Sequence, residues 1–474
     1  MALGKRKEVA QPLFISTANL PSVRSNPFYD AVNKVLAAHQ FDPFVESLCG
    51  KFYSDKVGRP GLAPGVYFRC LLIGYFEGLD SERGIAWRCS DSKSLGLFLG
   101  YAIDAKTPDH STISRTRRLI DLETHQEVFA YVLKILANHD LIDGKTIGVD
   151  STTLEANAAL RSIVRRDSGQ GYQDFLTELA KQSGIETPTR EDLAKLDKKR
   201  KNKGNNDDWQ NPHDPDAKIT KMKDGTTHLA HKAEHAVDLG EAGHGAILAV
   251  NVCDAVVGDT KTLCDTINEA SEHLRTIVDD GRVSDKISEQ WASEVVTDKG
   301  YHSNDIMRDL TQMELRSYVS EPDRGQRSWT APDSASDDAA LDLLDARDAT
   351  YANRRRIKGE RGKALLRRRG EFLERSFAHA YETGAMRRLH LRHRDNIAKR
   401  VLIHVAGFNL GLLMRLKYGL VKPRRLHQAA FFALARLWSA WRRLHAAIGV
   451  IEDGIGMIAS RIETATTVSA GRAA

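Results

Sequence analysis

The sequence is poor in cysteine, has no long apolar run and carries little net charge. Its five cysteines are odd in number and contain no C-x-x-C pair, which argues against a disulfide framework and a zinc knuckle and predicts reduced, partly buried thiols. No apolar run reaches the roughly 18 residues of a membrane span. The N-terminus has a basic start but lacks the apolar core of a signal peptide. We therefore expect a cytoplasmic protein with no membrane partner.

Charge is distributed unevenly, although its total nearly cancels. The chain of 474 residues carries 69 Lys and Arg against 63 Asp and Glu, a net charge of +6. Basic residues gather at 198–203, 354–369 and 386–400. Each cluster alone is compatible with a solvated helix face, but such clusters are also typical of a surface that follows a phosphate backbone. The length is sufficient for two or three domains.

Residues 25–142 are predicted to be helical, because apolar residues recur there at spacings of three and four. Pro64 marks a helix start and Ser81 a helix cap. Thr107 and Pro108 begin a further helix whose first turns hold short polar and basic side chains: Ser111, Thr112, Ser114, Arg115, Arg117 and Arg118. These residue types suit a helix that enters a DNA groove, and they equally suit a capped, solvated helix.

The pattern changes to strands at Lys145. Strands are predicted at 145–150, 227–239, 245–257, 293–298 and 315–321, with a helix at 259–278 between the third and the fourth. A hairpin followed by a helix and further strands predicts a mixed sheet with helices packed on it, an α/β fold of the α+β type.

Two insertions and two boundaries complete the predicted organisation. Residues 161–218 are polar and are expected to be rich in loops, and residues 323–370 are expected to form a helical insertion. From 371 to 420 the pattern is helical, and 396–416 is apolar enough for a core helix. The predicted parts are a helical domain at 1–142, a sheet domain at 143–420, and a C-terminal helix with a disordered tail at 421–474.

Two aspartates stand at the ends of predicted strands. Asp150 closes the first strand and Asp298 closes the fourth. If these strands are neighbours, both carboxylates project from one edge of the sheet, where oxygen ligands without thiols suit Mg²⁺ or Mn²⁺. Two such ions about 3.5 to 4 Å apart can support phosphodiester displacement. A third carboxylate would come from Glu371, Glu374 or Glu382, and the alternative is that the aspartates only cap turns.

Four ordered blocks carry a resemblance over nearly the whole chain. They include "TPDHSTISRTRRLI", "IGVDSTTLEANAAL", "VVTDKGYHS" and "ERSFAHAYETGAMRRLHLRHRDNIAKR". In these blocks the sequence resembles DDE-class transposases of bacterial insertion sequences. The resemblance implies a helical N-terminal DNA-binding domain and a mixed-sheet catalytic domain with the ribonuclease-H-like fold.

The resemblance also implies the site residues. Asp150, Asp298 and Glu374 would be the catalytic, metal-binding triad for two Mg²⁺ ions, for which Mn²⁺ can substitute, with Glu371 in reserve. Related transposases often carry Lys or Arg one or two turns after the glutamate, where this chain has Tyr381. DNA contacts are therefore expected from Arg115, Arg117, Arg118, Lys299, Tyr301, Arg387, Arg388 and Arg392.

Several side chains have competing interpretations. Asp259 is predicted to cap a helix beginning at Thr260, with a position behind the metal ligands as the alternative. Lys299 and Tyr301 are predicted to contact DNA rather than only to form a turn. A zinc site is not expected at His228, His231, His235 and His244, which lack cysteine partners.

The function implied by the resemblance is DNA transposition. The protein would bind double-stranded DNA, at terminal inverted repeats and at a target, and would catalyse metal-dependent strand cleavage and strand transfer. Pairing of two ends implies a homodimer or larger assembly at the nucleoid in the cytoplasm. The alternatives are a metal-dependent nuclease of the same fold that cannot join strands, and a catalytically inactive DNA-binding protein. An aspartyl-phosphate hydrolase is excluded, because Thr152 stands where it would need a second aspartate.

Overall fold

The structure is a computed structural model, which describes part of the chain. The described residues are 25–423, except for 55–59, 201–203, 223–224, 242–243, 282, 324, 326, 328 and 330–336. The helix and tail predicted for 421–474 lie outside the described residues, apart from 421–423. The described residues up to Leu420 form one compact unit.

The first part of this unit is entirely helical, as predicted. Its helices are α1 (Pro27–Ala38), α2 (Phe41–Cys49), α3 (Pro64–Glu77), α4 (Glu82–Asp91), α5 (Lys93–Phe98), α6 (His110–Leu119) and α7 (Leu122–Asn138). Ser81, Asp109 and Asp121 accept hydrogen bonds from backbone N–H groups in the first turns of α4, α6 and α7. Each such cap contributes about 1 kcal/mol. The predicted cap at Ser81 is confirmed.

One long helix, α14 (Arg394–Tyr418), connects these helices with the sheet. It packs on α3, α7 and the strand β6 (Ile247–Asp254). Gly407 permits close contact, because a Cβ there would approach the Tyr75 ring to 2.9 Å. By length and composition α14 could cross a membrane, but 89% of its most apolar window is buried within the protein. Packing thus accounts for its apolar character, and the predicted core helix is confirmed.

The sheet has six strands and mixed direction, which confirms the predicted fold class. Besides β6 it contains β1 (Thr146–Glu155), β4 (Lys218–Lys221), β5 (Thr227–Asp238), β7 (Glu294–Thr297) and β8 (Arg316–Val319). The strand order is β4-β5-β1-β7-β8. β6 pairs with residues 231–237 of β5, next to the stretch 227–230 that pairs with β4. β1 is antiparallel to β5 and parallel to β7, which is parallel to β8.

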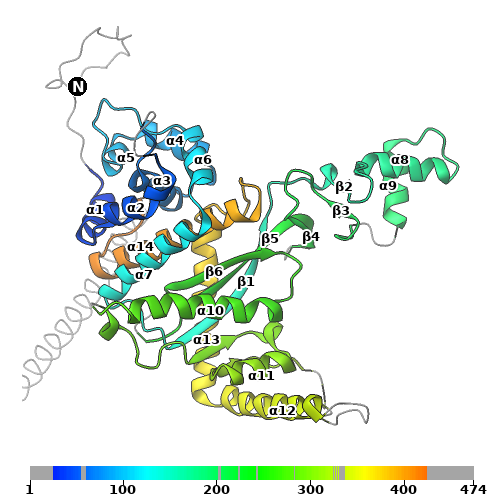
Figure 1. Cartoon of the computed structure of the whole chain (residues 1–474). Coiled ribbons are helices and arrows are strands. Elements are labelled where there is room, and N and C mark those ends of the chain that lie inside the picture. Colours follow the sequence, from blue (N-terminus) through cyan, green and yellow to red (C-terminus); the bar gives the residue numbers. More distant parts are fainter. Residues whose placement is uncertain are drawn as a thin grey trace, which may run out of the picture. The chain divides into compact units, whose positions relative to one another are not determined.

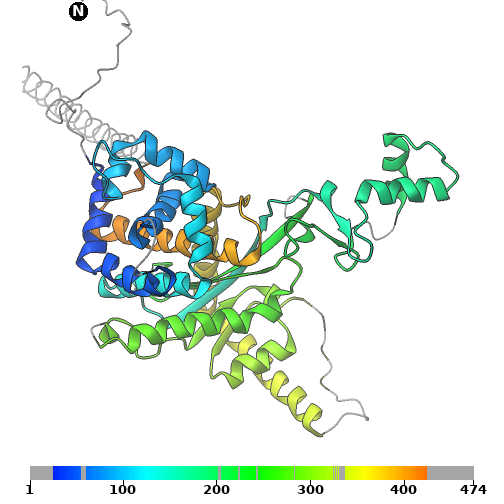
Figure 2. The same ribbon diagram turned by 45° about the horizontal axis from the view of Figure 1, so that its top comes forward.

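Helices cover both faces of the sheet (Figure 1). Ser151 bonds to Asp259 of α10 (Asp259–Val278), whereas the preceding Asp150 pairs with Arg369 of α13 (Glu360–Phe377). Because successive strand residues point to opposite faces, α10 and α13 lie on opposite sides of β1. The turned view shows α10 running across one face (Figure 2). Two further helices, α11 (Asn304–Gln312) and α12 (Asp337–Lys358), flank β8.

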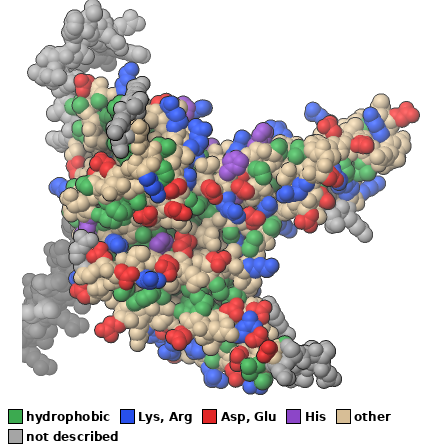
Figure 3. Space-filling view, in the orientation of Figure 1, with side chains coloured by type: hydrophobic (Ala, Val, Ile, Leu, Met, Phe, Trp, Pro, Cys, Tyr) green, Lys and Arg blue, Asp and Glu red, His purple; other side chains and the backbone are tan. Residues whose placement is uncertain are grey.

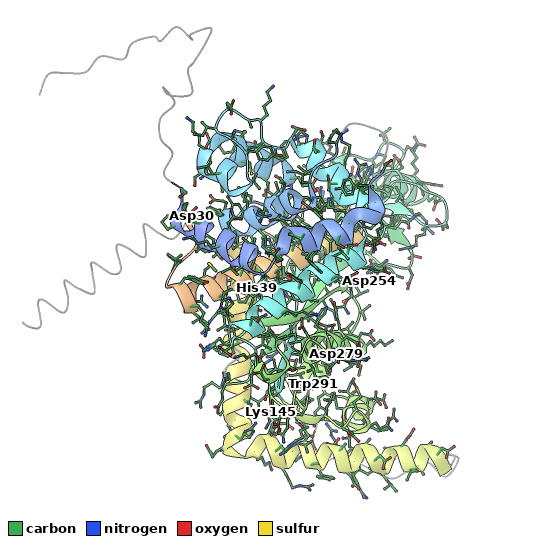
Figure 4. All side chains as sticks on the ribbon, turned by 60° about the vertical axis from the view of Figure 1, so that its left-hand side comes forward. Asp30, His39, Lys145, Asp254, Asp279 and Trp291 are labelled. Atoms are coloured by element: carbon green, nitrogen blue, oxygen red, sulfur yellow. The ribbon has the colours of Figure 1, made fainter. Side chains whose placement is uncertain are left out.

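Parallel strands β1 and β7 begin at the same edge. Lys145 before β1 and Trp291 before β7 lie near each other (Figure 4). The Lys145 ammonium donates to Gln290, and the Ala292 N–H donates to the Gly144 carbonyl. Both strands consequently end at the opposite edge, where Asp298 follows β7.

The segment that connects β1 to β4 in the sequence forms an arm that extends from the sheet (Figure 1). It contains β2 (Val164–Arg165), α8 (Tyr172–Gln182), α9 (Arg190–Lys199) and β3 (Trp209–Gln210). This segment, 161–218, was expected to be rich in loops, and the two helices correct that expectation. Thr189 and Asp192 form a capping box at the start of α9, and Leu176, Ala180 and Leu193 make a small core of their own.

The helical pattern after residue 370 is interrupted. α13 begins inside the predicted insertion 323–370 and ends at Phe377, and a π turn follows at Ala378–Glu382. The residues from there to α14 are not helical, and Ala385 and His393 have positive φ angles of 61° and 67°, which a right-handed helix does not contain. Short 3₁₀ turns occur at Gly50–Phe52, Leu160–Ser162, Ser284–Lys286 and Lys299–Tyr301.

Candidate active site

Asp150 and Asp298 lie side by side on neighbouring parallel strands. Gly148 of β1 pairs with Val296 of β7, and each aspartate follows its member of this pair by two residues. Asp298 directly follows the end of β7, as predicted. Asp150 was expected to end its strand, but β1 continues to Glu155 because residues 151–155 pair with β5.

The two carboxylates converge on one cation, the guanidinium of Arg369. Its Nη2 lies 2.8 Å from Asp150 Oδ2 and 3.9 Å from Asp298 Oδ2. The other oxygens are held by backbone, since the Ser151 N–H donates to Asp150 Oδ1 and the Gly300 N–H donates to Asp298 Oδ1, both at 2.8 Å. Each carboxylate therefore presents one oxygen toward a shared point.

Glu374 lies on α13, which also carries Arg369. Arg368 and Phe372 approach Gly240 and Gly245, at the edge where β1 begins. At about 100° per residue, Glu374 lies on the flank of α13 opposite to Arg368 and Phe372. This flank is directed toward the edge of the sheet where β1 and β7 end. Its side chain is exposed and has no hydrogen bond or ion pair with either aspartate among the described residues.

Glu371 occupies a different position on the helix. It points away from the face of α13 that covers the sheet, and its carboxylate pairs with Arg375 one turn later on the exposed side. The position of α13 thus favours Glu374 over Glu371 as a third carboxylate.

Asp259 lies behind the two aspartates. α10 begins at Asp259 itself, after the N-cap Gly258, so the predicted cap of a helix starting at Thr260 is wrong. Asp259 Oδ1 instead accepts hydrogen bonds from Ser151 Oγ at 2.9 Å and Lys232 Nζ at 3.1 Å. A Cβ on Gly300 would lie 3.2 Å from Asp259 Oδ2 and 3.1 Å from an Asp298 oxygen, so these carboxylates are near neighbours.

Lys232 is a site residue that the sequence interpretation missed. It is 4% exposed, and its ammonium bonds to the Val257 carbonyl, Asp259 and Thr262. The position of Lys232 in the middle of the predicted strand 227–239 was the available signal, because an unpaired buried ammonium is costly.

A buried polar layer supports the strand that carries Asp150. His235 of β5 pairs in register with Asp150 and contacts the hydroxyls of Ser376 at 3.0 Å and Tyr381 at 2.6 Å. Burial disfavours the charged ring and lowers the pKa of His235 to about 3. Tyr381 is fully buried here, which explains why this position does not carry a basic DNA contact.

The two predicted DNA contacts beside Asp298 have different environments. Lys299 is exposed. Tyr301 is buried, and its hydroxyl donates to Glu234 Oε1 at 2.8 Å, so the structure places it in the core and not at a DNA surface. Burial raises the pKa of Glu234, whose carboxylate also accepts hydrogen bonds from Thr262 and Thr266.

Basic side chains line a hollow beyond the end of β1. Arg388 and Arg392, two of the residues expected to contact DNA, are exposed there and share a space of about 500 Å³ with Arg161, His213 and His228. Figure 3 shows basic and histidine side chains where the arm joins the sheet.

Arg387, the neighbour of these residues, faces inward. Its Nη1 donates to Thr152 Oγ1 at 2.9 Å and to the Thr153 carbonyl at 2.8 Å. Its contacts are structural in this arrangement.

The predicted DNA-reading helix α6 exposes two of its three arginines. Arg115 and Arg118 are exposed, but Arg117 is 6% exposed and its guanidinium binds Glu82 at 2.6 Å and Asn396. The structure thus makes Arg117 a link between α4, α6 and α14. A hollow of about 500 Å³ beside α6 is lined in part by Arg83, Trp87, Lys106 and His110.

A second cluster of possible metal ligands lies elsewhere. The ligand atoms of Asp214, Asp216 and His393 lie within 4.8 Å of one another. Asp214 accepts hydrogen bonds from the His393 N–H and from His231, and Asp216 accepts one from the Arg394 N–H. These carboxylates cap the beginning of α14, which is a structural role.

Comparison with known proteins addresses the N-terminal helices. No curated protein matches the chain. Residues 20–119, which include α1 to α6, match the family described as Transposase domain (DUF772). The N-terminal helices are thus similar to a domain of transposases, which supports a transposase role for the chain.

Proposed function

We propose that this chain is a DDE-class transposase with a ribonuclease-H-like catalytic core. The observation that carries this proposal is the convergence of Asp150 and Asp298 on a single cation, the Arg369 guanidinium. The position of Glu374 on the flank of α13 toward the same edge of the sheet supports it as the third carboxylate. The similarity of residues 20–119 to a transposase domain supports the reaction class.

The donor set fits Mg²⁺ or Mn²⁺. The proposed ligands are carboxylate oxygens only, which hard divalent cations prefer, and Arg369 Nη2 already stands where a cation neutralises both aspartates. Asp150, Asp298 and Glu374 would hold the metal. When bound, two such ions activate the attacking oxygen and stabilise the leaving oxygen of a phosphodiester.

The protein groups around the aspartates serve orientation. The N–H groups of Ser151 and Gly300 fix one oxygen of each carboxylate and leave the other directed toward the shared point. Asp259 and Lys232 anchor Ser151 from the opposite face of the sheet. Such positioning is the main contribution a protein can make to a displacement in which it forms no covalent bond.

Two basic surfaces are suited to DNA. One is the hollow with Arg388 and Arg392 beyond the end of β1, and the other is the hollow beside α6 with Arg83 and Lys106. Each Lys or Arg that neutralises a phosphate releases counterions and makes binding sensitive to salt. We assign target or end DNA near the triad to the first surface and terminal-repeat recognition to the second, and the joining of two ends requires at least a dimer.

The experiment that tests this function is a cleavage and joining assay. A labelled fragment carrying the DNA that flanks the gene would be incubated with a plasmid and with Mg²⁺, Mn²⁺ or EDTA. The proposal predicts metal-dependent nicks at the repeat ends and joined products, both lost in Asp298→Asn. Nicks without joining would indicate a nuclease, and binding without cleavage would indicate an inactive DNA-binding protein.

A further inference from the structure

Arg369 lies between the two proposed catalytic aspartates, and its side chain is more buried than either of theirs. Its side chain is 12% exposed, against 23% for Asp150 and 43% for Asp298. One nitrogen, Nη2, contacts both carboxylates and also donates to the Val149 carbonyl at 3.3 Å. The guanidinium therefore lies at the point toward which Oδ2 of Asp150 and Oδ2 of Asp298 are directed.

This position leaves Arg369 incompletely satisfied. Its Nε is buried and has no hydrogen-bond partner among the described residues. A buried donor without a partner is unfavourable. The ion pairs of the guanidinium with the aspartates therefore have to offset the free-energy cost of the unpaired Nε. That cost makes the arrangement easier to displace than a fully bonded bidentate pair.

We propose that Arg369 is a displaceable counter-ion that competes with the divalent metal for Asp150 and Asp298. The inference rests on the proposed function, because it takes these aspartates as metal ligands. Two carboxylates this close repel each other, and the guanidinium neutralises them before metal arrives. Metal loading then requires Arg369 to withdraw from the pair.

Competition of this kind weakens the apparent affinity for metal. If the guanidinium occupies the pair in about 90% of molecules, only about 10% are competent, and the apparent Kd rises about tenfold. Removal of the guanidinium should therefore tighten metal binding, even though it removes a favourable contact of the metal-free protein.

The test measures Mn²⁺ binding to the full chain by the electron paramagnetic resonance signal of free Mn²⁺. Arg369→Gln is predicted to bind Mn²⁺ about tenfold more tightly than the wild type. Arg367→Gln makes the same charge change at an exposed position of the same helix and should leave the affinity unchanged. Asp150→Asn identifies the binding that belongs to this site.

A second measurement uses the wild-type protein and does not depend on a variant that folds. Arginine labelling with phenylglyoxal, read by mass spectrometry, should modify Arg369 slowly in EDTA and faster with Mn²⁺, whereas the labelling of Arg367 should not change. Equal Mn²⁺ affinity in Arg369→Gln and wild type, or labelling of Arg369 that metal does not increase, would overturn the competition alone. If wild type and Asp150→Asn bound Mn²⁺ equally, no binding would belong to this site, and both the competition and the proposed metal site would be overturned.

Discussion

Arg387 donates a hydrogen bond from Nη1 to Thr152 Oγ1 at 2.9 Å. This bond connects the segment between α13 and α14 to β1, the strand that carries Asp150. A second bond to the Thr153 carbonyl reinforces the link. The adjacent Arg388 is exposed and forms a 3.4 Å ion pair with Glu155. Two consecutive arginines thus have separable roles.

Arg387→Ala should reduce stability, while Arg388→Ala should reduce DNA binding. Arg387 also donates to the exposed Glu382, and loss of all three hydrogen bonds from this charged, half-buried donor is expected to lower the free energy of unfolding by about 1–3 kcal/mol. Arg388→Ala should change it by less than about 0.5 kcal/mol, because surface substitutions rarely do more. Its loss should instead weaken DNA binding and reduce the slope of log K against log salt by about 1. Chemical denaturation and salt-dependent binding measure the two effects, and equal salt slopes in both variants would contradict the assignment.

Arg117 and Arg118 form a second matched pair. Arg117→Ala leaves the carboxylate of Glu82, whose side chain is 12% exposed, without its partner and should destabilise the fold by about 3–5 kcal/mol. Arg118→Ala removes an exposed charge and should leave thermal unfolding nearly unchanged. Calorimetry of both variants checks this difference, and a stable Arg117→Ala protein would show that the buried pair is dispensable.

Asp259→Asn should affect the reaction without unfolding the protein. The substitution removes the charge that orients Ser151 and Lys232 but keeps the shape of the side chain. Partners of metal ligands typically contribute 10- to 100-fold, so cleavage at fixed Mn²⁺ should fall by about this factor. Because the role is positional, higher Mn²⁺ should restore part of the rate. A rate that does not respond to Mn²⁺ would argue against a position of Asp259 behind the proposed metal ligands.

Acid should destabilise the protein through His235. Its pKa is lowered to about 3 in the fold, against about 6.5 in the unfolded chain, so the unfolded state binds the proton first as the pH falls. The contribution of the neutral His235 ring to the free energy of unfolding is therefore complete above about pH 6.5. It declines by about 1.4 kcal/mol per pH unit as the pH falls from about 6.5 to about 3. His125, whose pKa burial lowers to about 4, adds to the effect.

The variant His235→Gln separates this contribution from the rest. It should be less stable than the wild type at pH 7 but should lose about 2 kcal/mol less between pH 7 and 5. Denaturation at several pH values measures the slopes. Parallel slopes in the two proteins would assign the acid sensitivity to other groups.

The sequence predicted those features that local pattern determines. Apolar spacing located the helices of residues 25–142, the helix at 259–278 and the strand before Asp298, because each buries one face or both. The pattern could not predict that β1 continues past Asp150. Residues 151–155 are mostly polar, and only their pairing with β5 makes them a strand.

Side-chain direction accounts for most of the remaining differences. Three arginines follow one another at 367–369, and only the helix that begins at Glu360 determines that Arg369 faces the aspartates. In the same way, Arg117 and Tyr301 stand among mostly polar residues in the sequence, but their partners Glu82 and Glu234 come from distant segments. Such contacts have no local signal.

The most direct measurement of the central claim compares Glu374→Gln with Glu371→Gln in the strand-joining assay with Mn²⁺. Both glutamates lie on the exposed side of α13 one turn apart, and both changes remove one charge. The proposed triad predicts that Glu374→Gln reduces joined product on the order of 10³-fold, as loss of a group that stabilises the transition state does, while Glu371→Gln stays near wild type. Joining that survives in Glu374→Gln, or is lost equally in both variants, would contradict Asp150, Asp298 and Glu374 as the catalytic set.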